Sequence, residues 1–243
     1  MKKYIAPLLG TARGVWILSI GLFIIGFVLA AGVSSTTPTA FTAKVLVGWV
    51  TVGLSTAGLG HFALDALWGK SRPHLYSWLI WSIMNAIVWL NQWSHAAGPG
   101  AWSTFMMMVL SAVIFVIALW QWRTGTADHK LTTMDQWCFG GAIASIVILV
   151  LYSTGPISIL AATITDGLAF ASTYRKIWSH PSSEPASNYT LNTIRQSLVI
   201  AAIGSYNFVT LAFPVSLIFL NVITVVLIYL CVRQLAVVPQ HAE

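Results

Sequence analysis

The chain has 243 residues, of which 57 % are hydrophobic and only 7 % are charged, and its mean hydropathy is +0.80. Soluble domains carry about a quarter charged residues, so this composition excludes an ordinary soluble domain and indicates an integral membrane protein. Twelve Lys and Arg residues against six Asp and Glu residues give a net charge of +6. The basic residues lie singly or in pairs between apolar segments. This scatter argues against a nucleic-acid-binding surface and favours the basic flanks of membrane helices.

A transmembrane helix needs about 20 apolar residues, so the chain is long enough for seven or eight of them. The hydrophobic pattern predicts eight, in chain order: 15–31, 45–68, 75–93, 101–122, 136–152, 157–174, 190–208 and 211–232. The first follows a basic N-terminus and precedes small residues, as a signal peptide would, but its length favours a retained helix. The Gly98-Pro99-Gly100 turn predicts a tight hairpin between the third and fourth helices.

The basic residues also predict how these helices are oriented. With a cytoplasmic N-terminus, eleven of the twelve Lys and Arg residues fall on the cytoplasmic side, and only Lys44 falls outside. This is the positive-inside distribution of membrane proteins. Both termini are therefore predicted to be cytoplasmic. The protein is expected in the cell (inner) membrane, where the lipid bilayer is its surrounding partner.

Related residues recur along the chain at a nearly constant distance. Asn85 and Gln196 lie 111 residues apart, and Ser111 and Asn221 lie 110 apart. The second to fourth and the sixth to eighth helices are therefore predicted to be parallel copies of one three-helix unit, with the fifth helix as the linker crossing. The expected fold is an all-α polytopic membrane protein. Its predicted parts are an N-terminal helix and loop (1–43), a first repeat (44–123), a linker (124–155), a second repeat (156–234) and a tail (235–243).

The segment 172–187, STYRKIWSHPSSEPAS, resembles the PQ-loop motif of the PQ-loop and SWEET-like transporter family. The matching positions are Lys176, Trp178, Ser182, Glu184 and Ser187. A fainter copy lies at Trp68, Lys70 and Ser77. The resemblance implies a fold of two three-helix units joined by a linker helix, with cytoplasmic PQ loops. It also implies transport of a sugar, an amino acid or a similar metabolite, although a related receptor lineage shares the fold.

Two of the six acidic residues lie inside predicted helices, where ionisable groups are costly and usually functional. Asp166 is flanked by Thr and Gly residues and is a candidate for solute binding and proton coupling; hydrogen bonding to Arg195 or Tyr206 is the structural alternative. Asp65 lies four residues after His61, so the two side chains share a helix face and could relay a proton or form a gate. Alternatively, Asp65 pairs with a nearby basic residue (Lys70 or Arg72).

Several uncharged side chains complete the candidate site. Asn85 and Asn221 lie in the middle of predicted helices and could bind a polar solute or tie helices together. Trp81 and Trp89 offer aromatic faces, with helix packing as the alternative role. Gln196 and Arg195 could line a cytoplasmic vestibule, although extension to the membrane interface is the favoured expectation for Arg195.

The sequence contains none of the usual catalytic motifs: no nucleophile elbow, no HExxH pair and no phosphate-binding glycine loop. No metal site, disulfide or cofactor is expected, because Cys138 and Cys231 lie in separate apolar segments without CxxC spacing. The protein is therefore predicted to be a small-polar-solute transporter that works by alternating access, with proton coupling as a further hypothesis. The alternatives are a receptor or assembly factor of the same fold, and a vitamin transporter similar to nicotinamide riboside carriers. A homo-oligomer is compatible with all of these functions.

Overall fold

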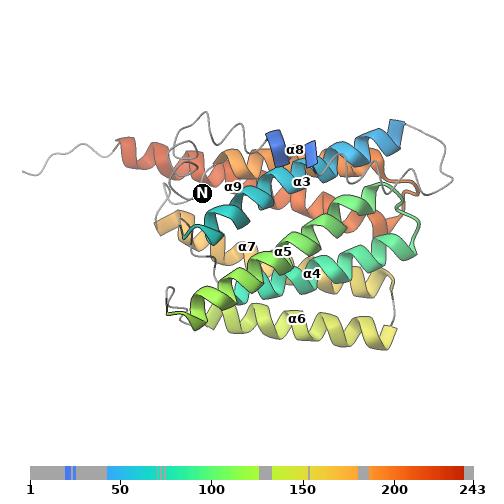
Figure 1. Cartoon of the computed structure of the whole chain (residues 1–243), viewed down its shortest axis with the longest axis horizontal. Coiled ribbons are helices and arrows are strands. Elements are labelled where there is room, and N and C mark those ends of the chain that lie inside the picture. Colours follow the sequence, from blue (N-terminus) through green and yellow to red (C-terminus); the bar gives the residue numbers. More distant parts are fainter. Residues whose placement is uncertain are drawn as a thin grey trace, which may run out of the picture.

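A computed structural model describes residues 20–22, 24, 25, 43–69, 71, 73, 75–125, 133–152, 154–179 and 186–237, and these residues form helices joined by turns (Figure 1). The seven long helices are α3 (Ala43–Leu67), α4 (Leu75–Ser94), α5 (Gly100–Arg123), α6 (Thr133–Tyr152), α7 (Pro156–Ser179), α8 (Ala186–Ala202) and α9 (Phe208–Val237). They confirm the prediction of an all-α chain and correspond to the second to eighth predicted segments. The first predicted segment lies mostly outside the described residues, and the few described there are helical.

The boundary between α8 and α9 differs from the prediction. The sequence pattern extends a helix to residue 208, but α8 ends at Ala202 and a turn follows at 203–207. Asn207 and Thr210 then begin α9 by exchanging two bonds: the Thr210 amide donates to Asn207 Oδ1, and the Asn207 amide donates to Thr210 Oγ1, both at 3.1 Å. This reciprocal capping satisfies amides that a helix leaves unpaired at its start.

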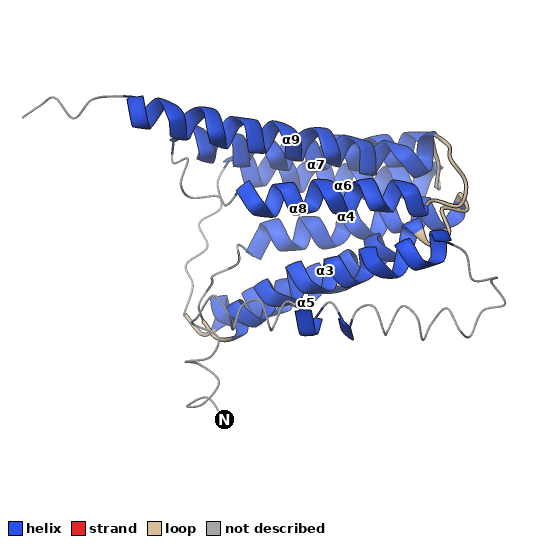
Figure 2. Ribbon diagram, turned by 90° about the horizontal axis from the view of Figure 1, so that it is seen from above, coloured by secondary structure: helices blue, strands red, loops and turns tan. Residues whose placement is uncertain are grey.

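The long helices lie side by side in one bundle, and their connections gather at its two ends (Figures 1 and 2). One end contains the start of α3 and the α4–α5, α6–α7 and α8–α9 turns; we call it the Lys44 end. The other contains the C-terminal ends of α3, α5, α7 and α9 and is called the Arg123 end. The two charged residues that give these names are therefore at opposite ends of the bundle.

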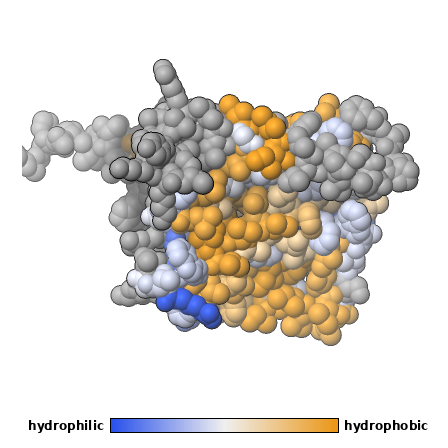
Figure 3. Space-filling model, viewed as in Figure 1, coloured by the Kyte–Doolittle hydropathy of each residue, from blue (hydrophilic) through white to orange (hydrophobic). Residues whose placement is uncertain are grey.

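The face of the bundle seen in Figure 3 is largely apolar, as expected for contact with lipid. Three of the helices are long and apolar enough to cross a membrane: α3, α5 and the segment Phe208–Val232 of α9. Large apolar side chains are exposed along several helices, among them Phe105, Val116, Trp120, Ile143, Val150, Phe219, Val226 and Leu230. These features are compatible with an integral membrane protein.

Helix packing follows the same order in the two halves of the bundle. In the first half, α5 packs against both α3 and α4; in the second, α9 packs against both α7 and α8. The contacts between the halves are reciprocal, because α3 packs on α8 as α7 packs on α4. Helix α6 packs against α7 and α4. We refer to α3–α5 as the first unit and to α7–α9 as the second unit.

The two units meet closely at the Lys44 end. The Gly204 amide of the α8–α9 turn donates to the Ala97 carbonyl of the α4–α5 turn at 2.8 Å. A Cβ atom on Gly100 would lie 2.8 Å from Ile203 Cγ1, so only glycine allows this approach. Lys44 Nζ adds a bond of 2.7 Å to the Ile203 carbonyl. The predicted hairpin at Gly98-Pro99-Gly100 thus forms and also joins the two units.

Two glycines of α3 provide a test of this close packing. A Cβ atom on Gly48 would lie 2.7 Å from Pro99 Cβ in a rigid ring, whereas a Cβ atom on Gly58 would meet nothing within 4 Å. We expect Gly48→Ala to destabilise the fold by about 1–3 kcal/mol through overpacking. Gly58→Ala should be neutral or stabilising by up to about 1 kcal/mol through helix propensity. Thermal unfolding of both variants in detergent measures the difference; equal unfolding midpoints would contradict it.

Candidate functional site

Asp166 is a buried acid on the second unit. It lies on α7, is 5 % exposed, and its Oδ2 atom has no hydrogen-bond partner among the described residues. Ala162 and Phe170, one helical turn away on either side, pack into the apolar cluster that α4, α6, α7 and α9 share. A carboxyl group without a hydrogen-bond partner in these surroundings is costly for the fold, above all when it is ionised, unless a ligand interacts with it.

The structural alternatives considered for Asp166 are not formed. No ion pair or hydrogen bond links it to Arg195 or Tyr206 in the part of the chain that is described. Arg195 bonds instead to Ser55 and Asn192. Tyr206 lies in the α8–α9 turn, where its ring is 4.9 Å from Lys44 Nζ.

Arg195 is the second buried charge, and here the sequence expectation is wrong. It was expected to extend to the membrane interface, but it is 5 % exposed and points into the contact between α8 and α3. Its Nη1 donates to Ser55 Oγ at 3.0 Å, and its Nη2 donates to Asn192 Oδ1. Hydrogen bonds to neutral oxygen atoms, one on α3 and one on its own helix, hold the guanidinium inside the bundle and away from the interface.

A chain of hydrogen bonds extends from Arg195 through both units. In the first unit, Ser55 on α3 pairs with Ser103 on α5 at 2.9 Å. In the second unit, Asn192 donates to Asn221 Oδ1 on α9 at 3.2 Å, and Asn221 donates to the Leu217 carbonyl at 2.6 Å. This Arg195 network connects α3, α5, α8 and α9.

The network includes one predicted site residue, Asn221, which is 1 % exposed. Sequence reasoning did not assign Ser55 or Asn192 to the site. One signal could have found Asn192: it lies three residues before Arg195, on the same face of the predicted helix.

The other predicted amides lie on helices next to these charges. Asn85 on α4 is buried and donates to the Trp81 carbonyl at 2.8 Å, and Gln196 on α8 is buried beside Arg195 in the sequence. Helix α4 packs against α7, which carries Asp166, and α8 packs against α3. The candidate polar residues therefore come from helices that face each other across the two units.

These residues also lie at similar depths. Counting residues from the Lys44 end of each helix, at 1.5 Å per residue, places Asn85 and Asp166 about 13–15 Å deep and Arg195 and Gln196 about 10 Å deep. Asn221 is deeper, at about 20 Å. In helices that cross a bilayer core of about 30 Å from their Lys44 ends, residues at these depths would fall in the middle third. We call these residues the polar band.

The predicted pair of His61 and Asp65 forms. Their Nε2 and Oδ2 atoms are 3.3 Å apart, and both side chains are about one-quarter exposed near the Arg123 end of α3. The alternative partners, Lys70 and Arg72, lie outside the described residues. The pair is therefore separate in depth from the polar band.

The predicted aromatic residues pack mainly against other aromatic residues of the first unit. Trp81 meets Trp78 edge to face at 4.9 Å, and Trp78 stacks on Phe62 at 5.1 Å. Trp89 lies 5.1 Å from the ring of Phe105. These contacts hold α3, α4 and α5 together and match the packing role considered for the tryptophans.

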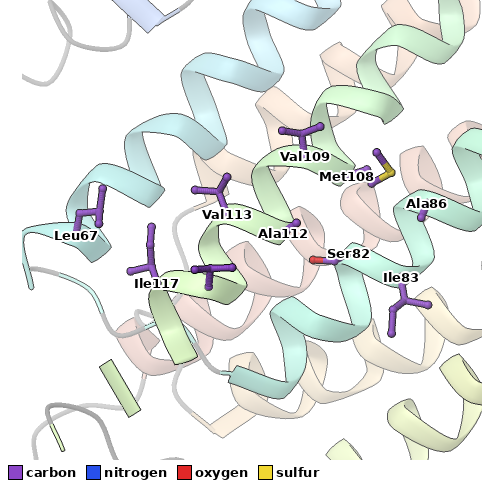
Figure 4. Close-up of a pocket in the computed structure, with 10 residues that line it drawn as sticks. Leu67, Ser82, Ile83, Ala86, Met108, Val109, Ala112, Val113 and Ile117 are labelled. Carbon is purple, nitrogen blue, oxygen red and sulfur yellow. The ribbon is translucent and has the colours of Figure 1, made fainter. Parts of the chain in front are cut away.

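An apolar groove on the described part of the chain differs from the polar cavity expected of a transporter. It has a volume of about 720 Å³ and opens on the outside of the first unit, between α4 and α5 (Figure 4). Its lining is almost wholly apolar and includes Ile83, Ala86, Val109, Val113 and Val116. Such a surface suits lipid chains, and none of its lining residues belongs to the polar band.

Neither a metal cluster nor a match to a known protein adds to this picture. Among the described residues, no three His, Cys, Asp or Glu side chains lie close enough to bind a metal ion. Searches of family models, characterised sequences and solved structures find no match to the chain. The resemblance to PQ-loop proteins therefore remains a prediction. Two of its five matching positions, Ser182 and Glu184, lie outside the described residues.

Proposed function

We propose that this protein is a membrane transporter for a small polar solute and that it works by alternating access between the first and second units. The reciprocal packing of the two units carries the proposal, because a pseudo-twofold interface lets one unit rock against the other around a central site. The polar band lies at that interface and includes two buried ionisable residues, Asp166 and Arg195, that make no ion pair among the described residues. Buried ionisable groups in membrane helices are typical of solute and ion pathways.

The proposal includes a topology and a conformational state. The chain has eight membrane-spanning helices, both termini are cytoplasmic, and the Lys44 end faces outward. Close contact between the α4–α5 and α8–α9 turns then corresponds to a closed outer gate. The solute would leave or enter this state through the Arg123 end, near the pair of His61 and Asp65.

A reversible cross-link across the Lys44 end tests the proposal. Ala96 and Ser205 are exposed residues in turns that bond to each other, one from each unit. The variant Ala96→Cys/Ser205→Cys would carry alanine at Cys138 and Cys231 and be reconstituted into liposomes. The liposomes would then be incubated with a defined mixture of sugars, amino acids, organic acids and organic cations, and the solutes retained inside would be identified by mass spectrometry.

We expect a membrane-impermeant cross-linker with two thiol-reactive groups and a reducible linker to lower uptake at least fivefold when it reaches the outer face, and reduction of the linker to restore uptake. The single variant Ala96→Cys, treated identically, should be unaffected. Absence of uptake by the untreated protein for every solute, with protein-bound peptide or lipid instead, would contradict transport and favour a receptor or assembly factor. Uptake that continues in the cross-linked protein would contradict alternating access at this end.

A further inference from the structure

Arg195 is a buried charge that makes no ion pair with the described acidic side chains. Of the acidic side chains that the structure describes, Asp65 pairs with His61, and Asp166 makes no ion pair. The partners of the guanidinium are the neutral oxygen atoms of Ser55 and Asn192. Withdrawing an arginine from water costs several kcal/mol, which neutral hydrogen bonds recover only in part.

A purely structural role does not explain why an arginine occupies this position. Helices in a membrane are commonly tied by Ser, Thr, Asn or Gln, and the network around Arg195 already contains such residues. Replacing a buried ionic group by a neutral one is often neutral or stabilising. What arginine adds is a permanent positive charge and a planar fork of five donors, which binds carboxylates and phosphates through two parallel bonds.

The contacts of Arg195 place this fork at the junction that alternating access would open. Nη1 bonds to Ser55 in the first unit, while Arg195 itself belongs to the second unit. Movement of α3 away from α8 would break this bond and leave an Nη1 donor unpaired. Asn192, on the same helix, would continue to orient the guanidinium through Nη2.

We infer that Arg195 binds an anionic group, a carboxylate or a phosphate, on the transported solute, and that Ser55 occupies its Nη1 donor when no solute is bound. The inference rests on the proposed function and specifies its substrate class. Neutral sugars and organic cations would accordingly be poor substrates.

The test compares variants of Arg195 in the same liposome uptake assay. Wild-type protein should retain solutes that carry a carboxylate or a phosphate. For those solutes, Arg195→Gln should raise KM at least tenfold, because it keeps hydrogen bonding and loses the charge, and Arg195→Lys should give an intermediate KM. Gln121→Leu is the matched control: Gln121 is buried and bonds to the Ala66 carbonyl at 2.7 Å, but within the first unit. Its KM should equal that of wild type.

Ser55→Ala gives a second readout that does not depend on losing the arginine. Without the competing hydroxyl, KM should fall below the wild-type value. Uptake restricted to neutral or cationic solutes would overturn the inference and leave transport intact, whereas absence of all uptake would overturn the proposed function itself. A wild-type KM in Arg195→Gln would also overturn the inference. The same would follow if Ser55→Ala raised KM, or if the lysine and glutamine variants were equally impaired.

Discussion

Replacing Asp166 by leucine is expected to stabilise the fold and to lower solute uptake at least 100-fold. Leucine branches at Cγ as aspartate does and would place methyl groups in the apolar cluster around Ala162 and Phe170. It would also remove an Oδ2 atom that has no hydrogen-bond partner among the described residues. Relief of one such unsatisfied group contributes about 1–3 kcal/mol.

The loss of uptake follows from the position of Asp166 at the contact between α7 and α4. A group that destabilises the fold and has no internal partner is retained only if it interacts with something during function. The adjacent residue is a matched control. Thr165 is also buried, but its hydroxyl bonds to Ser145 Oγ and the Ala161 carbonyl, each at 3.0 Å. Thr165→Val should therefore cost about 1 kcal/mol of stability and leave uptake unchanged.

Thermal unfolding in detergent should show that Asp166→Leu raises stability and Thr165→Val lowers it. Liposome uptake should be lost only in Asp166→Leu. A stabilised Asp166→Leu protein with normal uptake would remove Asp166 from the site. Asp166→Asn addresses proton coupling separately, because the amide keeps the shape and cannot exchange a proton. If uptake by Asp166→Asn still responds fully to an imposed pH gradient, the coupling group lies elsewhere, with the pair of His61 and Asp65 as the next candidate.

The helices could be predicted from the sequence because membrane insertion depends on local composition. Each apolar run of about 20 residues forms its own backbone hydrogen bonds, and polar turns such as Gly98-Pro99-Gly100 end it. The α8–α9 boundary was misplaced for a related reason. It depends on capping by Asn207 and Thr210 inside a stretch that contains no charge and little hydropathy contrast.

The candidate site was predicted less completely, because burial depends on contacts between distant segments. Asp166 was identified, since any acid in the middle of an apolar helix is costly. Arg195 was assigned to the interface, because a long basic side chain near a helix end usually extends to water. Its burial is determined by Ser55, 140 residues earlier in the chain, and no local pattern predicts that pairing.

Loss of the Lys44 ammonium is expected to open the Lys44 end. Nζ belongs to the first unit and bonds to the Ile203 carbonyl of the second at 2.7 Å, 4.9 Å from the ring of Tyr206. A hydrogen bond from a charged donor contributes about 1.5 kcal/mol or more, which is about tenfold in an equilibrium. Lys44→Met keeps the apolar stem and removes the bond. The ratio of open to closed molecules should therefore rise about tenfold.

Spin labels at Ala96 and Ser205 would report this shift, because each exposed turn belongs to a different unit. In Lys44→Met the short-distance population should decrease and a longer one should increase, whereas Lys44→Arg, which keeps a donor, should resemble wild type. A label pair at Ala43 and Ala96, both in the first unit, should give the same distances in all three proteins. If the distances between Ala96 and Ser205 are also unchanged, Lys44 does not hold the end closed. The close approach of Gly100 to Ile203 and the bond from Gly204 to Ala97 would then be sufficient for closure, and opening would depend on solute binding to the polar band.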